Sequence, residues 1–223
     1  MKIDFDEEKH EYSVGGIRIP SVSDILAPLS AERYADINPA VLAQAAARGT
    51  AVHEMCEAMD YGLEPEIEPG LEGYAQAYAD FLRDYFPAWD MVEQIVAYRS
   101  IFEEKPYYCG TVDRFGVIDG KHCVLDIKSY ASLTTDGMVS ASCQTSLYRS
   151  AIYSDSGTNP DKIRELVRTK RYLLHLNKGG NYRLVDLDKF DLERGFNSGS
   201  VAWSLCKLWH DLDNARNWKK GKK

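Results

Sequence analysis

Two apolar runs joined by Asp119-Gly120 constrain the fold of this 223-residue chain more than any other feature. The runs, GTVDRFGVI and KHCVLDIK, are rich in β-branched and aromatic residues, which is typical of strands. An aspartate followed by a glycine favours a two-residue turn between antiparallel strands. The sequence therefore predicts a hairpin in which Phe115 faces Val124 and Asp113 faces Asp126.

The same hairpin places charges where a core is expected. Side chains alternate along a strand, so Asp126 and Lys128 share one face, and cross-strand pairing puts Asp113 on that face too. Opposed carboxylates about 5 Å apart repel each other and destabilise a sheet unless a positive charge lies close by. A divalent cation bridging both carboxylates removes this repulsion, and hard oxygen ligands suit Mg²⁺ or Mn²⁺.

The alternative interpretation is an exposed hairpin face with two solvated aspartates. Against it, Phe115 and Val124 lie on the same face as the charges, which indicates that this face is half-buried. The opposite face carries Cys123, Leu125 and Ile127, which we expect to pack against a core. The pattern of residues therefore favours a metal site, provided that the turn contains two residues.

Periodicity and turn residues predict a series of further helices and strands. In chain order these are a hairpin around Gly15-Gly16, a helix capped by Ser21 or Ser23, an alanine-rich helix opened by Asn38-Pro39, an amphipathic helix over 71–86, a strand over 92–102, helices over 142–155 and 161–170, a hairpin around Lys178-Gly179-Gly180 and a final helix over 201–218. We expect Gly49 to interrupt the alanine-rich helix and Thr50 to cap its second segment.

This order of elements predicts one α/β domain with a mixed central sheet flanked by helices. Within residues 1–223 we expect three parts: an N-terminal hairpin and helices over 1–90, a central core with the charged hairpin over 91–155, and a C-terminal helix-hairpin-helix over 156–223.

Composition narrows the class of protein without deciding its function. There is no run of about 18 apolar residues, and the charged N-terminus is unlike a secretory signal, so we expect a cytoplasmic protein without a membrane partner. The five cysteines contain no CxxC pair, which favours ordinary buried thiols. The net charge of −7 hides two basic runs, 161–171 and 216–223, and neither alone indicates a nucleic-acid partner.

Four motifs, in order, resemble the PD-(D/E)xK nucleases, specifically the RecB-like branch. GTVDR followed by a hairpin and LDIKS is similar to motifs II and III of that superfamily. RGTAVHEMCE resembles its helix with a histidine metal ligand, here His53, and QTSLY matches its QxxxY motif, here Gln144 and Tyr148. The segment HEYSVGGIRIPSVSDIL resembles the N-terminus of small phage and prophage exonuclease-like members. The matches run from His10 to Tyr148.

The resemblance implies a restriction-endonuclease-like fold and metal-assisted hydrolysis of phosphodiester bonds. Asp113 and Asp126 would bind one or two Mg²⁺ or Mn²⁺ ions, with His53 and the carbonyl of Ile127 as further ligands. Lys128 would orient the attacking water or offset charge on the transition state. The remaining motif residues, Gln144 and Tyr148, would hold the nucleic-acid backbone or keep the strand with Asp126 and Lys128 in register.

Some features depart from the resemblance or limit it. Relatives often carry another acidic residue on the preceding strand, and Glu93, Glu103 and Glu104 all compete for that role, so a second metal stays open. The chain has no cysteines spaced to hold the iron-sulfur cluster of CRISPR-associated relatives. It also has no Walker A motif, so ATP is not expected as a cofactor, and any helicase would be a separate chain.

The sequence as a whole predicts a stand-alone, Mg²⁺-dependent deoxyribonuclease that acts on DNA. The resemblance favours an exonuclease of phage or bacterial recombination or repair, located in the host cytoplasm if phage-encoded. Partners such as a separate recombinase, single-strand-binding protein or helicase would fit that role. Two alternatives stay open: a structure-specific endonuclease, and a catalytically inactive scaffold of the same fold that binds nucleic acid.

Overall fold

A mixed five-stranded sheet forms the centre of the protein, as the computed structural model shows for residues 2–6, 9, 11–99, 105–154 and 159–217. The strands lie side by side in chain order: β4 (Ala88–Arg99), β5 (Pro106–Ile118), β6 (Lys121–Lys128), β7 (Lys170–Leu176) and β8 (Tyr182–Asp186). β6 and β7 are parallel, and the other neighbours are antiparallel. The predicted single α/β domain with a mixed sheet is confirmed.

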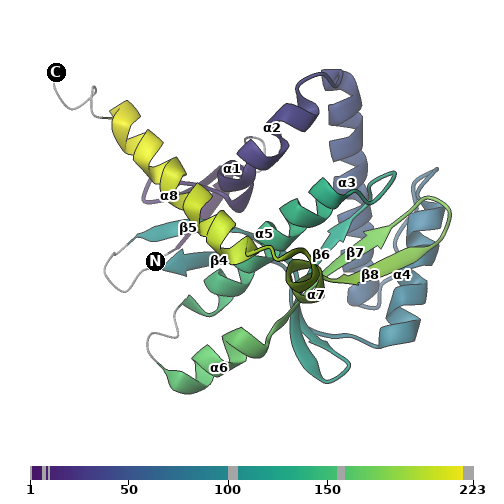
Figure 1. Ribbon diagram of the computed structural model, residues 1–223. Helices are drawn as coiled ribbons and strands as arrows, with labels where there is room; N and C mark the ends of the chain where they lie inside the picture. The colour runs from purple at the N-terminus through teal and green to yellow at the C-terminus, as the bar shows by residue number, and fades with distance from the viewer. Residues whose placement is uncertain (1, 7–8, 10, 100–104, 155–158, 218–223) are drawn as a thin grey trace.

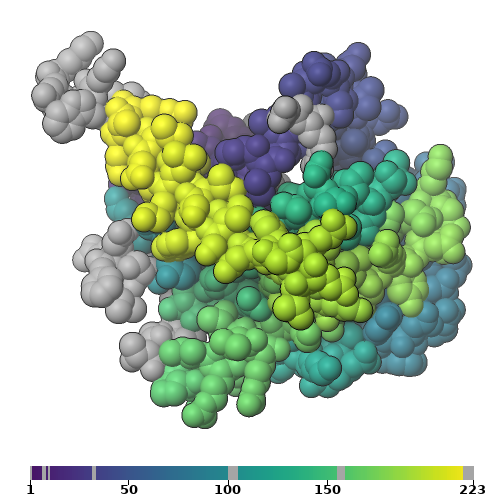
Figure 2. Space-filling view, in the orientation of Figure 1, coloured from purple at the N-terminus to yellow at the C-terminus, as the bar shows by residue number. Residues whose placement is uncertain are grey.

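Helices cover both faces of this sheet (Figure 1). One face packs against α3 (Pro39–Asp60) and α4 (Glu72–Tyr85), and the other against α1 (Val22–Leu26), α5 (Thr135–Ile152) and α8 (Ser198–Asn217). The remaining helices are α2 (Pro28–Tyr34), α6 (Pro160–Arg168) and α7 (Leu187–Arg194). In the space-filling view, α8 and the segment from α2 to the start of α3 project on either side of a hollow (Figure 2).

The charged hairpin has the predicted two-residue turn. Asp119 and Gly120 both have positive φ, at 49° and 71°, which a tight hairpin turn of this kind requires. Phe115 pairs with Val124, as predicted. Both faces of the hairpin are buried. The charged face is therefore more deeply buried than the half-buried face that the sequence predicted.

A second, three-stranded sheet stands at the N-terminus, composed of β1 (Asp4–Asp6), β2 (Glu11–Val14) and β3 (Ile17–Ile19). The predicted turn at Gly15-Gly16 and the cap at Ser21 are confirmed, while the strand β1 was not predicted. Tyr12 ties this sheet to the main one, because its hydroxyl lies 2.8 Å from Thr111 Oγ1 on β5. His10 lies outside the described residues.

The helix α3 contradicts the predicted interruption at Gly49. It runs unbroken from Pro39 to Asp60, with Asn38 as the expected N-cap. Thr50 is not a cap: its hydroxyl donates to the Ala46 carbonyl one turn earlier. A glycine inside a helix lowers helix stability by only about 1 kcal/mol relative to alanine, and the surrounding alanines favour the helix strongly enough to offset this loss.

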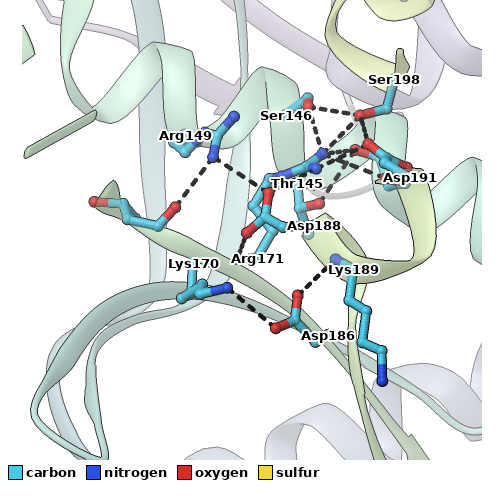
Figure 3. Close-up of polar contacts among 12 residues, drawn as sticks. Thr145, Ser146, Arg149, Lys170, Arg171, Asp186, Asp188, Lys189, Asp191 and Ser198 are labelled. Carbon is cyan, nitrogen blue, oxygen red and sulfur yellow. Dashed lines mark hydrogen bonds and ion pairs between the residues drawn. The ribbon is translucent and has the colours of Figure 1, made fainter. Parts of the chain in front are cut away.

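A buried polar cluster around Arg171 joins β7 to three helices (Figure 3). Arg171 ends the basic run at 161–171, yet its side chain lies inside the protein between Asp188 and Asp191 of α7. The helix α7, absent from the predicted helix-hairpin-helix, supplies these two carboxylates. The charge of Arg171 therefore stabilises the interior of the protein and is not part of a basic surface.

All five cysteines are buried free thiols, as predicted, and burial raises the pKa of each above its ordinary value. No helix in the described part of the chain combines the length and the apolar character needed to cross a membrane.

Candidate metal centre

The site begins where β5 and β6 separate. Their paired positions end at Arg114 and Leu125, one residue before Asp113 and Asp126. Beyond that point Asp113 Oδ2 accepts a hydrogen bond from the backbone N–H of Ile127, at 2.6 Å. The register is the predicted one, although the paired positions end one residue before the two aspartates, and the Asp113 carboxylate reaches across to the residue that follows Asp126.

Asp126 is the most deeply buried acid of the site, with 1 % of its surface exposed. Its Oδ1 accepts from Lys128 Nζ at 2.7 Å, whereas its Oδ2 is buried with no hydrogen-bond partner. Burial raises the pKa of Asp126 to about 6, although the charge of Lys128 opposes this rise. An unpartnered buried carboxylate oxygen is costly, and a cation or a further hydrogen-bond donor would offset that cost.

Lys128 lies beside both aspartates, as predicted. Burial alone would lower the pKa of Lys128, but the charges of Asp126 and Asp113 outweigh it and raise the pKa above its ordinary value. The ammonium group is therefore charged at neutral pH, and 19 % of the Lys128 side chain is exposed to solvent.

His53 reaches the same place from α3. Its Nδ1 lies 3.0 Å from Glu93 Oε1, and its Nε2 lies 3.1 Å from the Ile127 carbonyl and 3.8 Å from Asp113 Oδ2. Burial lowers the pKa of His53, but Asp113 and the contact with Glu93 raise it by more, to about 9. His53, Asp113 and the Ile127 carbonyl, which the resemblance implies as metal ligands, therefore lie close together.

Glu93 is the acidic residue that the sequence could not single out. It lies between the pairs Val92–Arg114 and Gln94–Val112, opposite Asp113, and has a positive φ of 45°. His53, Glu93 and Asp113 each offer a ligand atom within 4.8 Å of the others. Its competitors Glu103 and Glu104 lie outside the described residues.

Arg114 is a second residue that sequence reasoning missed. Its side chain is fully buried, and its Nη1 donates to Glu93 Oε1 at 2.8 Å while its Nε donates to Asp60 at the end of α3. Asp60 also accepts hydrogen bonds from Tyr78 and Trp89. An arginine directly after Asp113 is the only local signal that the sequence offered.

Gln144 and Tyr148 approach from α5, on the opposite face from His53. Gln144 Nε2 lies 3.4 Å from the Tyr148 hydroxyl, and burial raises the pKa of that tyrosine above its ordinary value. Together with Glu93 and Asp113 they line a pocket of about 190 Å³ that extends to Tyr12 and the start of α1. The pocket gives a small molecule or chain end a place to lie next to the carboxylates.

The donor set fits a divalent cation. Carboxylate oxygens, one backbone carbonyl and an imidazole nitrogen are ligands that Mg²⁺ or Mn²⁺ accept. Four carboxylates, Asp60, Glu93, Asp113 and Asp126, face the permanently charged Arg114 and Lys128, so two negative charges would remain once His53 has given up its proton to a bound cation. One divalent cation would balance that charge.

No protein-family model matches the chain, and no curated protein matches it significantly.

Proposed function

We propose that this protein is a Mg²⁺- or Mn²⁺-dependent DNA nuclease with a restriction-endonuclease-like fold, of the RecB-like kind. The observation that carries the proposal is the unpartnered, buried Oδ2 of Asp126, next to Lys128. Asp126 lies outside the group of ligand atoms formed by His53, Glu93 and Asp113, but the charges of Asp113 and His53 act on it. Such an unpartnered oxygen is costly in a purely structural cluster, and a bound cation would offset that cost.

Three side chains and one carbonyl would hold the cation: Asp113, Asp126, His53 and the Ile127 carbonyl. When bound, the cation supplies Lewis acidity, polarising a phosphate oxygen and lowering the pKa of a nearby water. Burial keeps water away from these groups and strengthens their electrostatic effect on a phosphate.

Lys128 is the side chain best placed to assist hydrolysis. It is charged at neutral pH, and Asp126 fixes its Nζ at the site. Its charge would orient the attacking water or stabilise the extra negative charge of the transition state. Gln144 and Tyr148, on the wall of the pocket, would contact the substrate beside the scissile phosphate.

An assay with end-labelled linear DNA and closed circular DNA tests this proposal. We expect the linear DNA to be degraded with Mg²⁺ and to survive with EDTA; survival of the circle would indicate an exonuclease, and its cleavage an endonuclease. Asp126→Asn and Lys128→Ala should each lower the rate by at least about a hundredfold, since removing one electrostatic contact to a transition state has effects of this size.

Circular dichroism should show that both variants remain folded, and Glu165→Gln on α6 is the matched control, an exposed acid at the other end of β6 and β7. Unchanged hydrolysis in Lys128→Ala would remove the proposed mechanism. DNA binding that is indifferent to EDTA, without cleavage, would favour an inactive scaffold.

A further inference from the structure

Glu93 contacts its neighbours through a single oxygen. Its Oε1 accepts from Arg114 Nη1 at 2.8 Å and lies 3.0 Å from His53 Nδ1. A carboxylate can only accept, so His53 must carry a proton on Nδ1. Nε2 also faces only acceptors, the Ile127 carbonyl and Asp113, so it too carries a proton in the metal-free protein. A cation between these groups would replace the proton on Nε2, while Glu93 keeps the proton on Nδ1.

Arg114 holds Glu93 in this position from within the core. Its guanidinium bridges Asp60 and Glu93 and also donates to the carbonyl of Asp113, at 2.6 Å. Asp60 in turn is fixed by the Tyr78 hydroxyl, at 2.7 Å, so little of this arrangement is free to move. The result is a buried link from the end of α3, through β5 and β4, back to His53 on the same helix.

We propose that Glu93 and Arg114 are positioning residues, which orient His53 so that Nε2 faces the cation, and that the site binds one cation rather than two. This inference rests on the proposed metal-dependent function. Histidines that bind metals commonly donate their other N–H to a carboxylate, which fixes the ring and strengthens the ligand. Arg114 supplies the positive charge beside Glu93 that a second cation would otherwise provide.

Calorimetric titration of the whole protein with Mn²⁺, followed by electron paramagnetic resonance, tests this inference. We expect one Mn²⁺ per chain in both the wild type and Glu93→Gln, with a spectrum of isolated ions. The dissociation constant should rise about tenfold in Glu93→Gln, which keeps an acceptor, and up to about 100-fold in Glu93→Ala. Glu165→Gln is again the control and should bind Mn²⁺ like the wild type.

We expect the fold to tolerate these substitutions of Glu93, because 22 % of its side chain is exposed. Arg114→Lys is a second variant: lysine keeps the charge but cannot bridge both acids, so we expect weaker Mn²⁺ binding at unchanged stoichiometry. Nitrogen-15 spectra of Mg²⁺-saturated protein should show the His53 proton on Nδ1 in the wild type and a mixture of tautomers in Glu93→Ala.

Two results would overturn the inference while sparing the proposed function. The first is two bound Mn²⁺ in the wild type that fall to one in Glu93→Gln, with coupled spins in the wild type only. The second is an unchanged dissociation constant in Glu93→Ala. If the wild type binds no Mn²⁺, the proposed function fails as well, so the two failures can be told apart.

Discussion

The protein contains two buried clusters of charged residues that differ in how completely they are satisfied. Around Arg171, every side-chain nitrogen of the guanidinium has a partner, and two arginines, Arg149 and Arg171, balance Asp188 and Asp191 (Figure 3). Among the described residues, three buried side-chain atoms lack partners. Two of them, Asp126 Oδ2 and Arg114 Nη2, belong to the site around Asp113, and the third is Arg48 Nε.

This difference distinguishes a cluster that stabilises the fold from the site that we propose to bind a metal. A buried polar network stabilises a fold only when all of its members are satisfied, and the Arg171 cluster meets that condition. The site around Asp113 has an excess of carboxylates and an unpartnered oxygen, which lowers stability unless a ligand compensates. We therefore expect the two clusters to respond in opposite ways to substitution, metal and pH.

The largest expected effect is a loss of stability on breaking the satisfied cluster. Arg171→Met leaves Asp188 and Asp191 without their main partner and should lower the free energy of unfolding by about 3–5 kcal/mol. Asp126→Asn, the matched change in the other cluster, removes a destabilised buried charge and should change the metal-free value by less than about 1 kcal/mol. Urea denaturation measures both, and equal losses would contradict the distinction.

The second effect is stabilisation by metal, which should involve one cluster only. Mn²⁺ at 100 times its dissociation constant should raise the free energy of unfolding by about 2.7 kcal/mol in the wild type, because the cation binds the folded state. Asp126→Asn should lose most of this gain, and Glu165→Gln should keep it. Thermal denaturation with and without Mn²⁺ provides the measurement; the same gain in Asp126→Asn would place the metal elsewhere.

The third effect is a dependence of metal-free stability on pH. Asp126 has its pKa raised from 3.8 to about 6, so the folded state binds more protons than the unfolded state between these values, and stability falls as the pH rises through this window. His53, raised from 6.5 to about 9, adds stability that is fully present below pH 6.5 and lost as the pH rises through 9.

Each of these groups contributes a slope of no more than about 1.4 kcal/mol per pH unit. Urea denaturation between pH 4 and 9 measures the slopes, and Asp126→Asn should abolish the lower one. Because Asp126 and His53 must lose their protons to bind a cation, Mn²⁺ affinity should increase as the pH rises from 5 to 8. An affinity independent of pH would argue against both residues as ligands.

The smallest effect concerns the wall of the pocket. Gln144→Ala removes a contact to the substrate but none to the cation, so we expect KM for DNA to rise by roughly threefold to tenfold, about the value of one or two hydrogen bonds. Mn²⁺ affinity should stay unchanged. Steady-state kinetics and calorimetry separate these quantities, and a loss of Mn²⁺ binding would show that Gln144 supports the metal site instead.

Local chemistry explains what could be predicted from the sequence. The Asp119-Gly120 turn and the alternation of side chains fix the hairpin register, and they place Asp113 next to the strand of Asp126 and Lys128. These signals lie within a few residues of each other, so no knowledge of the rest of the fold is needed.

Long-range pairing explains what could not be predicted. Glu93 stands opposite Asp113 only because of the register between β4 and β5, which shifts at two irregularities along the strands. Asp60 and Arg114 are 54 residues apart in the sequence, and no local sequence pattern predicts their contact. The helix α7 and its carboxylates were missed because LDKFDLER shows no strong apolar periodicity, although Leu187 and Phe190 are buried.

The central claim is that the cluster around Asp113 is incomplete without a divalent cation. Anomalous diffraction from crystals grown with Mn²⁺ tests it most directly. We expect one strong peak within about 2.0–2.6 Å of Asp126 Oδ2, an oxygen of Asp113, the Ile127 carbonyl and His53 Nε2. No peak there at saturating Mn²⁺, or an Asp126 Oδ2 bonded only to protein atoms, would contradict the account.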